Sequence, residues 1–357
     1  MATASGTVAP QSPQRRSPAL LVVALALALP ASMLCALALG AARVPFGDVL
    51  GYVGAGVSGG WIDAADLPDY QIVWQVRLPR VLLAAVVGAG LAAVGVASQA
   101  LVRNALADPF VLGVSSGASV GATAVIVLGA FAAFGVYALS VAAFLGALGA
   151  TALVYLAART PQGLTPLRLV LTGTALAYGF SAITTVLVFL APRGDAARSA
   201  LFWLLGSLGG VTWPSVPLAA AAVVAGVGYL LLYARALNAL AMGDETAAAL
   251  GVEPAPLRRR LFVVSAAVTG CLVAVSGAVG FVGLMVPHLV RMVTGADHRR
   301  LLAVAPLAGA VLLVWVDLLA RTLVAPQELP LGVLTAAIGV PVFVWLIRRR
   351  AYVFGGR

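Results

Sequence analysis

Long apolar runs recur along nearly the whole chain, and they constrain its fold more than any other feature of the sequence. Most of them have about the 20 residues that a helix needs to cross the ~30 Å hydrocarbon core of a bilayer. With 62% hydrophobic and 10% charged residues, the chain has more apolar surface than one water-soluble core can bury. The sequence therefore predicts an all-α, polytopic membrane protein, and it excludes a soluble enzyme, a coiled coil and a disordered protein. The runs cover 19–42, 81–102, 114–134, 136–158, 169–191, 216–234, 261–293, 301–323 and 331–347.

The run 261–293 is too long for a single crossing. As one helix it would measure about 50 Å, and arginines flank both of its ends. The segment 276–280, Ser-Gly-Ala-Val-Gly, offers a break at which the chain can turn round. Short limbs interrupted by glycine occur inside transporters, where neighbouring protein satisfies the free backbone groups. We therefore count two crossings here, which gives about ten transmembrane helices in all.

All 22 basic residues are arginines, and they gather in the gaps between the apolar runs. If the N-terminus lies inside the cell, sixteen of them face the cytoplasm and six face out, in agreement with the positive-inside rule. The sequence thus predicts a multi-pass protein of a bacterial cytoplasmic (inner) membrane with both termini in the cytoplasm.

Three regions are expected along the chain: a disordered cytoplasmic tail at 1–18, a transmembrane domain at 19–350 and a C-terminal tail at 351–357. The pair Arg15-Arg16 leaves a twin-arginine signal as a competing interpretation of the first region. The run 19–42 that follows is longer than a usual signal sequence allows, so a retained membrane helix is favoured.

The composition also excludes several kinds of chemistry. Without lysine, the chain has neither a Walker A loop for ATP nor a Schiff-base amine. Cys35 and Cys271 lie far apart inside apolar runs, and the two histidines, His288 and His298, complete no metal-ligand pattern. The net charge of +10 is spread over short gaps and not over one basic face. We therefore expect no catalytic residue, no cofactor, no bound metal and no nucleic-acid partner.

Residues 113–117 read Gly-Val-Ser-Ser-Gly and match the G-x-S-x-G pattern of a hydrolase nucleophile elbow. An elbow needs a strand before it and a helix after it, whereas a polar loop precedes this motif. The favoured interpretation is a helix start at which Ser115 or Ser116 caps the helix and free N–H groups face a cavity. An intramembrane hydrolase that uses Ser115 is the alternative.

Three arginines on the predicted outer side run against the charge trend. Arg77 and Arg80 begin the second crossing, and Arg321 follows Asp317 by four residues, which places both on one helix face. An acidic partner outside the membrane would explain these arginines. Lipid headgroups for Arg77 and Arg80, and a local ion pair between Asp317 and Arg321, are the simpler alternatives.

The segment 235–260 interrupts the apolar pattern and is predicted to form two short helices joined near Gly243. Asp244 or Glu245 would cap the second helix, and Gly251 would end it. Because the chain has no ATP site of its own, such a structured cytoplasmic insert predicts a docking site for another protein. A plain linker is the alternative.

Several longer motifs follow one another in a fixed order. They are Arg-Leu-Pro-Arg at 77–80, the stretch 99–118 with Asn104 and Leu106, Leu-Gly-Ser at 205–207, Gly-Asp-Glu and Leu-Gly-Val within 240–252, the stretch 280–291, and Glu-Leu-Pro with later glycines and proline in 328–341. Together they resemble the FecCD-type permease family, the membrane subunits of ATP-binding-cassette (ABC) importers for iron–siderophore complexes, haem and cobalamin. Ala105 stands where that family usually has proline, a departure that loosens the loop.

The resemblance implies the architecture of a type II ABC importer permease. It implies a second permease subunit, in a homodimer or a heterodimer, and two cytoplasmic ATPase subunits that hydrolyse the ATP. It also implies an extracytoplasmic substrate-binding protein and a metal chelate as substrate. A ferric siderophore is the favoured chelate, with cobalamin and haem as alternatives.

The same resemblance assigns three groups of site residues. One group would pair with glutamates of the binding protein, a second would couple the chain to the ATPase, and a third would line the translocation pathway and its cytoplasmic gate. In that order they are Arg77, Arg80 and Arg321; Leu240, Gly243, Asp244, Glu245, Leu250 and Gly251; and Asn104, Leu106, Ser115, Ser116, Thr165 and Pro166.

An ion-coupled secondary transporter is the rival from another class of membrane protein. It would need carboxylates within the membrane to carry protons or Na⁺. Apart from Asp317, no carboxylate falls within a predicted crossing.

Overall fold

The computed structural model describes residues 18–40, 42–161 and 163–349, and these ranges are predominantly helical and contain no β-strand. The all-α prediction is therefore confirmed. The helices are α1 (Pro18–Ala38), α2 (Phe46–Ser58), α3 (Leu67–Gln71), α4 (Leu78–Val102), α5 (Val114–Leu128), α6 (Ala138–Ala158), α7 (Pro166–Phe189), α8 (Gly194–Leu204), α9 (Ser215–Leu232), α10 (Ala234–Ala241), α11 (Asp244–Ala249), α12 (Pro254–Ser276), α13 (Val282–Thr294), α14 (His298–Ala320) and α15 (Leu331–Arg349).

Among the described residues, seven helical segments are long and apolar enough to cross a membrane. They contain α1, α4, α6, α7, α9, α12 and α14. Three shorter apolar helices, α5, α13 and α15, add to them. These ten match the ten predicted crossings in position, so the prediction of a polytopic membrane protein is confirmed. Except for Pro18, the two predicted tails lie outside the described residues.

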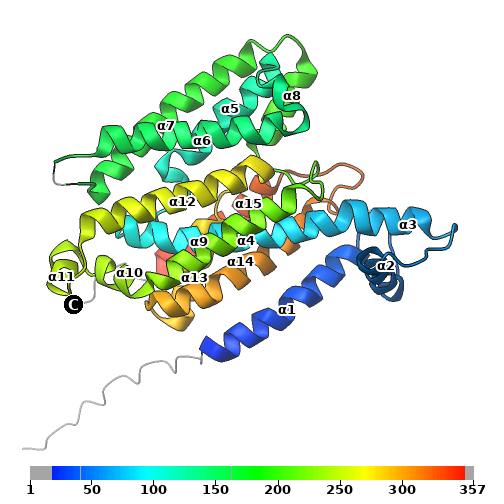
Figure 1. Cartoon of the computed structure of the whole chain (residues 1–357), viewed down its shortest axis with the longest axis horizontal. Helices are drawn as coiled ribbons and strands as arrows, with labels where there is room; N and C mark the ends of the chain where they lie inside the picture. Colours follow the sequence, from blue (N-terminus) through cyan, green and yellow to red (C-terminus); the bar gives the residue numbers. More distant parts are fainter. Residues whose placement is uncertain (1–17, 41, 162, 350–357) are drawn as a thin grey trace, which may run out of the picture.

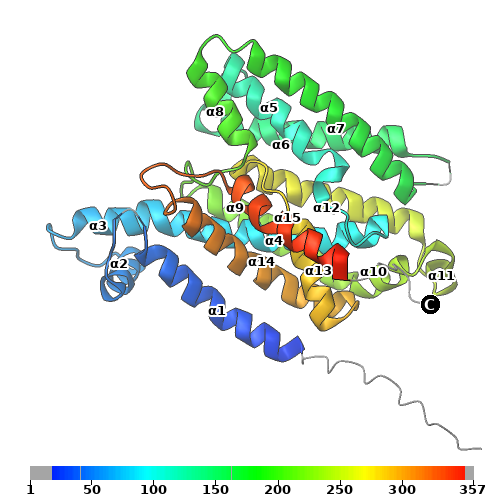
Figure 2. The ribbon, with the colours of Figure 1, turned by 180° about the vertical axis from the view of Figure 1, so that it is seen from behind.

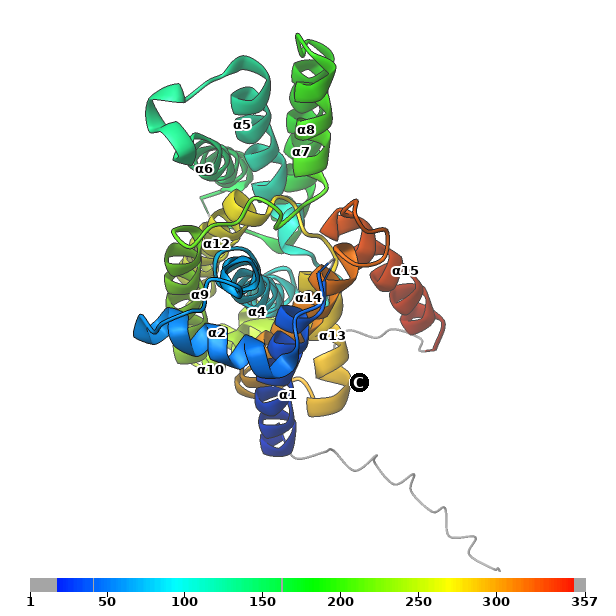
Figure 3. The ribbon, with the colours of Figure 1, turned by 90° about the vertical axis from the view of Figure 1, so that its right-hand side faces the viewer.

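Helix α4 forms the centre of the molecule. Of its 25 residues, 21 are buried, and α9, α12, α13 and α14 surround it in the end-on view of Figure 3. A helix that is apolar all round is typical of such an interior position. Figure 2 shows α1 running beside α14 at the edge of this group.

Helices α5, α6, α7 and α8 form a second group, which lies above the first in Figure 1. Helix α7 buries only Leu169, Gly173 and Thr184. Its remaining surface is largely apolar and exposed, as expected for a helix that faces lipid or another subunit. Helices α10 and α11 lie at one end of the molecule, and α2 and α3 lie at the other (Figure 1).

Glycine allows α4 to touch its neighbours backbone to backbone. A Cβ atom on Gly88 would lie 2.1 Å from the carbonyl oxygen of Gly309 in α14, and one on Gly95 would lie 2.0 Å from that of Gly283 in α13. No other residue type fits at these crossings. Small residues at helix contacts are the usual way to pack helices closely in a membrane.

The predicted break in 261–293 is confirmed, because α12 ends at Ser276 and α13 begins at Val282. Gly277 has a positive φ of 64° at the turn. A segment distant in sequence contacts the break through a backbone hydrogen bond, in which Ser207 N donates to Ser276 O (2.9 Å). The same segment is joined to the start of α15, because Gly206 O accepts from Leu331 N (2.9 Å). Non-helical backbone within a membrane protein requires such partners.

Two elements differ from the sequence expectation. Helix α8 (Gly194–Leu204) lies in a stretch for which no helix was predicted, because Arg193, Asp195 and Arg198 interrupt the apolar pattern there. Helix α2 (Phe46–Ser58) lies in the polar stretch between the first two apolar runs, in which no crossing was predicted.

Candidate functional site

Two groups of ion pairs lie at opposite ends of α4. We name them for the sides that the charge distribution predicts. The outer cluster consists of Arg77, Arg80, Asp317, Arg321 and Glu328. The inner cluster consists of Arg103, Asp244, Arg258 and the carbonyl group of Leu164.

In the outer cluster, one buried carboxylate holds two arginines. Asp317 lies 2.8 Å from Arg80 Nε and 3.4 Å from Arg321 Nε, and none of its surface is exposed. Arg80 Nη1 also donates to Glu328 Oε1 (2.7 Å), which belongs to the loop before α15. Buried charges are stable only when they are paired in this way.

The other arginine contacts anchor the end of α1. Arg77 Nη1 donates to Leu37 O (2.6 Å) and Ala38 O (3.2 Å), and Arg321 Nη2 donates to Ala36 O. The last carbonyl groups of a helix have no partner within it, and a guanidinium both satisfies them and opposes the negative end of the helix dipole. The outer cluster thus joins α1, α4 and α14.

The three arginines predicted to dock a binding protein are therefore engaged within the chain. Arg77, Arg80 and Arg321 are all buried, with at most 9% of their surface exposed. The local ion pair between Asp317 and Arg321 is present, and the acids that satisfy Arg80 belong to this same chain. A docking role for these arginines stays a prediction, and it would require a partner's carboxylate to displace a contact that the structure contains.

The segment 235–260, which is predicted to couple the chain to the ATPase and is called the coupling segment below, has the two predicted short helices. These are α10 and α11, with Gly243 between them at a φ of 117°. Gly251, at a φ of 78°, follows the second helix as expected. The predicted cap is wrong: α11 has no side-chain cap, because the carboxylate of Asp244 points instead to Arg258. Glu245 and Leu250 are exposed, whereas Leu240 is fully buried and supports the segment from within.

Asp244 is the centre of the inner cluster. Its two oxygens accept from Arg258 Nη2 (2.7 Å) and Nη1 (3.2 Å), and Arg103 Nη1 lies 3.8 Å away. The hydrogen bonds from Arg258 lower the pKa of Asp244 below its usual value, against the effect of partial burial. The carboxylate is therefore ionised at neutral pH, and Arg258 also donates to Leu164 O (2.9 Å).

Helix α10 is fixed separately. Asn238 Oδ1 accepts from the backbone N–H of His298 (2.9 Å) and lies 2.6 Å from His298 Nδ1, while Asn238 Nδ2 donates to Asp297 Oδ2 (3.1 Å). Asp297 also caps α14 by accepting from Arg300 N (3.1 Å). These hydrogen bonds were not predicted from the sequence, because Asn238 lies 60 residues before His298.

The predicted pathway residues occupy two loops and one helix start. Asn104 and Thr165 are exposed in loops, with Leu106 and Pro166 half-buried beside them. The predicted serine cap of α5 is wrong: the cap residue is Gly113, and the hydroxyl of Ser116 donates back to Gly113 O (3.0 Å). A 3-10 turn, Pro109–Leu112, precedes this helix start in place of the strand that a nucleophile elbow needs.

A cavity of about 520 Å³ lies beside α7 and the break after α12. Thr174, Tyr178 and Ser181 line it from one face of α7, and Phe281 and Asp108 contribute from other segments. Sequence reasoning did not select the α7 residues, although their spacing of four and three was a signal that they share a helix face.

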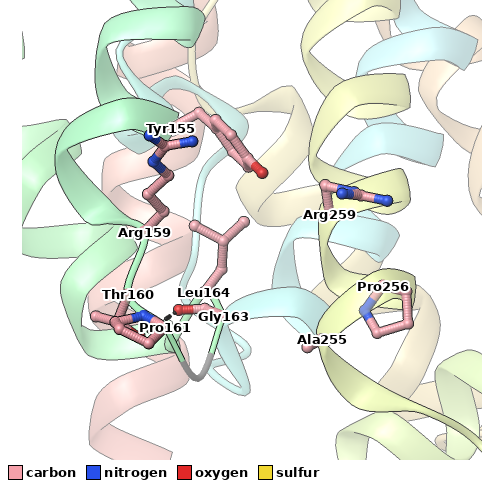
Figure 4. A pocket seen from close by; sticks show the side chains of 9 residues that line it. All are labelled: Tyr155, Arg159, Thr160, Pro161, Gly163, Leu164, Ala255, Pro256 and Arg259. Atoms are coloured by element: carbon pink, nitrogen blue, oxygen red, sulfur yellow. Dashed lines mark hydrogen bonds between the residues drawn. The ribbon is translucent and has the colours of Figure 1, made fainter.

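A second cavity, of about 600 Å³, separates the end of α6 from the start of α12 (Figure 4). Tyr155, Arg159 and Leu164 line one side, and Ala255 and Arg259 line the other. Figure 4 shows the guanidinium of Arg259 directed away from Arg159. The two cations therefore do not converge on one point.

A bundle of ten apolar helices, with a broken helix pair beside its centre and a structured polar insert at one end, defines a membrane permease. The FecCD transport family matches residues 26–349, and the chain belongs to that family. It is thus the membrane-spanning subunit of an ABC importer. A separate ATPase and a second permease subunit belong to such an assembly.

The similar proteins cover most of this chain. The cobalamin import system permease protein BtuC of Halobacterium salinarum is 46% identical over 78% of this chain and 74% of its own length. The hemin transport system permease protein HmuU of Yersinia pestis is 43% identical over 81% and 87%, and the Fe(3+) dicitrate transport system permease protein FecD of Escherichia coli is 40% identical over 92% and 98%.

A solved structure supports the same fold. It is described as an inward-facing conformation of a metal-chelate type ABC transporter and is 35% identical to this chain. The match covers 94% of this chain and 100% of that chain, with a TM-score of 0.80.

Proposed function

We propose that this permease carries a ferric siderophore across the bacterial cytoplasmic membrane, with both of its termini on the cytoplasmic side. A loaded binding protein would deliver the chelate to the outer end. ATP would close a pair of ATPase subunits against the coupling segment. The helices that line the pathway would then rock between outward-open and inward-open states.

Family membership over 26–349 carries this proposal. The named substrates of the relatives are an iron chelate, an iron porphyrin and a cobalt corrinoid, all of them large metal chelates. The cavity beside α7 supports it, because Phe110, Tyr178 and Phe281 offer apolar contact and Thr174 and Ser181 offer hydrogen bonds. Such a mixed lining suits a bulky chelate that must bind weakly and leave.

Cobalamin is the second candidate substrate. The cobalamin permease of Halobacterium salinarum shares 46% identity with this chain, more than the hemin and dicitrate permeases do. An ion-coupled mechanism has less support, because Asp317 is held by Arg80 and Arg321 and is not free to exchange a cation.

The experiment measures uptake into proteoliposomes that contain the complete complex. ATP is enclosed inside the vesicles, and the binding protein is added outside. Radiolabelled ferric siderophore, cobalamin and haem are compared. ATP-dependent accumulation of the siderophore alone supports the proposal. Accumulation of cobalamin or haem alone rejects the substrate, and accumulation that needs a proton gradient but no ATP rejects the mechanism.

The docking role of Arg77, Arg80 and Arg321 is tested with the binding protein itself. If these arginines pair with its carboxylates, Arg80→Gln weakens binding strongly at low salt and less at high salt, where such pairs are screened. Arg193→Gln, which removes an exposed arginine near α8, is the matched control. Equal binding by both variants at low salt would contradict the docking role.

A further inference from the structure

Asp244 lies where the coupling segment meets the rest of the chain. It is the first residue of α11, and it is half-exposed, with 44% of its side chain accessible. Its bidentate contact with Arg258 is a strong form of ion pair, because two parallel charge-assisted hydrogen bonds fix both distance and orientation.

Arg258 continues this connection into the protein. Only 2% of its side chain is exposed, and it donates a third hydrogen bond, to Leu164 O. Leu164 directly precedes Thr165 and Pro166, which belong to the predicted cytoplasmic gate. One guanidinium therefore joins α11 to the predicted gate segment, whose Leu164 lies 94 residues before Arg258 in the sequence.

A second connection leaves Asp244 through Arg103. This arginine ends α4 in the left-handed conformation, with a φ of 55°, and the next residue is Asn104 of the other predicted gate loop. Asn104 stabilises that loop, because its Oδ1 accepts from Leu106 N (2.9 Å). Both predicted gate loops are thus linked to the same carboxylate.

The two halves of the coupling segment differ in how firmly they are held. Helix α10 buries Leu237 and Leu240 and is locked to α14 through Asn238. Helix α11 buries only Ala247. A push on the segment therefore displaces α11 more readily than α10, since α11 has fewer apolar contacts to resist it.

The predicted gate segment 163–166, which follows α6, borders a cavity. Leu164 and Gly163 line the cavity of about 600 Å³ between the end of α6 and the start of α12 (Figure 4), and they contact α12 through Arg258 and Ala255. A segment that borders a cavity moves with fewer steric contacts than one that is packed on all sides.

We propose that Asp244 and Arg258 are positioning residues that transmit a displacement of α11 to the gate segment 163–166, with Arg103 as a weaker second link to Asn104. This inference rests on the proposed function, because it needs an ATPase that moves the coupling segment. The pair would make uptake follow ATP hydrolysis without touching either ATP or the substrate.

The test compares Asp244→Asn with Glu253→Gln in the complete complex in proteoliposomes. Glu253→Gln removes the same charge from an exposed residue at the start of α12. Uptake and ATP hydrolysis are measured in one preparation and expressed as substrate carried per ATP. Asp244→Asn is expected to lower this ratio at least about fivefold, the lower end of typical coupling between sites, and Glu253→Gln is expected to leave it unchanged.

A double variant separates transmission from stability. Asp244→Asn with Arg258→Met removes the uncompensated charge on Arg258, so a purely structural role predicts that coupling returns. Transmission predicts that the ratio stays low although the protein is stable. Recovery in the double variant, or a normal ratio in Asp244→Asn, would overturn the inference. If the wild-type complex itself shows no ATP-dependent uptake, the proposed function has failed instead.

Discussion

The outer and inner clusters share one plan but differ in exposure. In each, an aspartate sits between two arginines: Asp317 between Arg80 and Arg321, and Asp244 between Arg258 and Arg103. The side chain of Asp317 is 1% exposed and that of Asp244 is 44% exposed. Breaking a buried pair leaves charge without solvent. Water can replace the partners of the half-exposed Asp244, although it does not reach the buried Arg258 in the same way. We therefore expect the ion pairs of the outer cluster to stay formed, whereas those of the inner cluster can break and form again.

The largest expected effect is on the outer cluster. Asp317→Asn leaves the buried Arg80 and Arg321 without their shared countercharge, and we expect it to destabilise the protein by about 3–5 kcal/mol. Thermal unfolding of the purified protein in nanodiscs measures this. Glu328→Gln is the control, because Glu328 is partly exposed and its loss is expected to cost about 1 kcal/mol or less. Equal melting temperatures for both variants would mean that the burial of a carboxylate does not decide how much its ion pair stabilises the protein.

The next largest effect concerns the anchor of α1. Arg77→Gln removes charge-assisted hydrogen bonds to Leu37 O and Ala38 O, with an expected loss of about 1.5–3 kcal/mol. The link between α1 and α2 should then be cut faster by protease. A cleavage rate equal to that of the wild type would mean that α1 is held by its apolar contacts alone.

A smaller effect is expected on the stability of the inner cluster. Because Asp244 is half-exposed but its partner Arg258 is buried, Asp244→Asn should lower the stability of the protein by about 1–1.5 kcal/mol, less than Asp317→Asn does, although it uncouples transport. The melting temperature, measured beside that of Asp317→Asn, checks this. A destabilisation as large as that of Asp317→Asn would show that the inner cluster stabilises the fold as much as the outer cluster does.

The smallest expected effect is that of pH. Arg258 lowers the pKa of Asp244, so the stability that the pair contributes is present above the ordinary pKa of an aspartate, about 3.9, and is lost only as the pH falls through the lowered value. We therefore compare the substrate carried per ATP by the wild type with that carried by Asp244→Asn. The quotient of the two values should stay constant between pH 5 and pH 8, about one to four units above that ordinary value. A ratio that changes across this range would assign the titration of Asp244 to the transport cycle.

The sequence was sufficient to predict the ten apolar helices and the positions at which they are interrupted. Apolar runs indicate helices that lie in lipid, and glycines such as Gly243 and Gly277 indicate turns that other residues adopt only with strain. Both signals are local in the sequence. The helix α8 was missed for the same reason: its charged residues break the apolar pattern, although their helix packs against other protein.

The partners of the charged residues could not be predicted from the sequence. Counting arginines on each side gave an orientation but no pairing, since Arg80 meets Asp317 across 237 residues and Glu328 across 248. Packing of α4 against α14, through Gly88 and Gly309, brings Arg80 and Asp317 together. The spacing of Asp317 and Arg321 did predict their pair, because one turn of helix suffices for it.

Helix α13 has a consequence for how the chain is made. Its 13 residues span about 20 Å, well short of the hydrocarbon core, and Pro287 lies inside it. A nascent segment of this length gains too little from lipid to remain inserted alone. We expect it to enter the bilayer together with α12, as one hairpin, and to be held at its final depth by the close contact of Gly283 with Gly95 in α4.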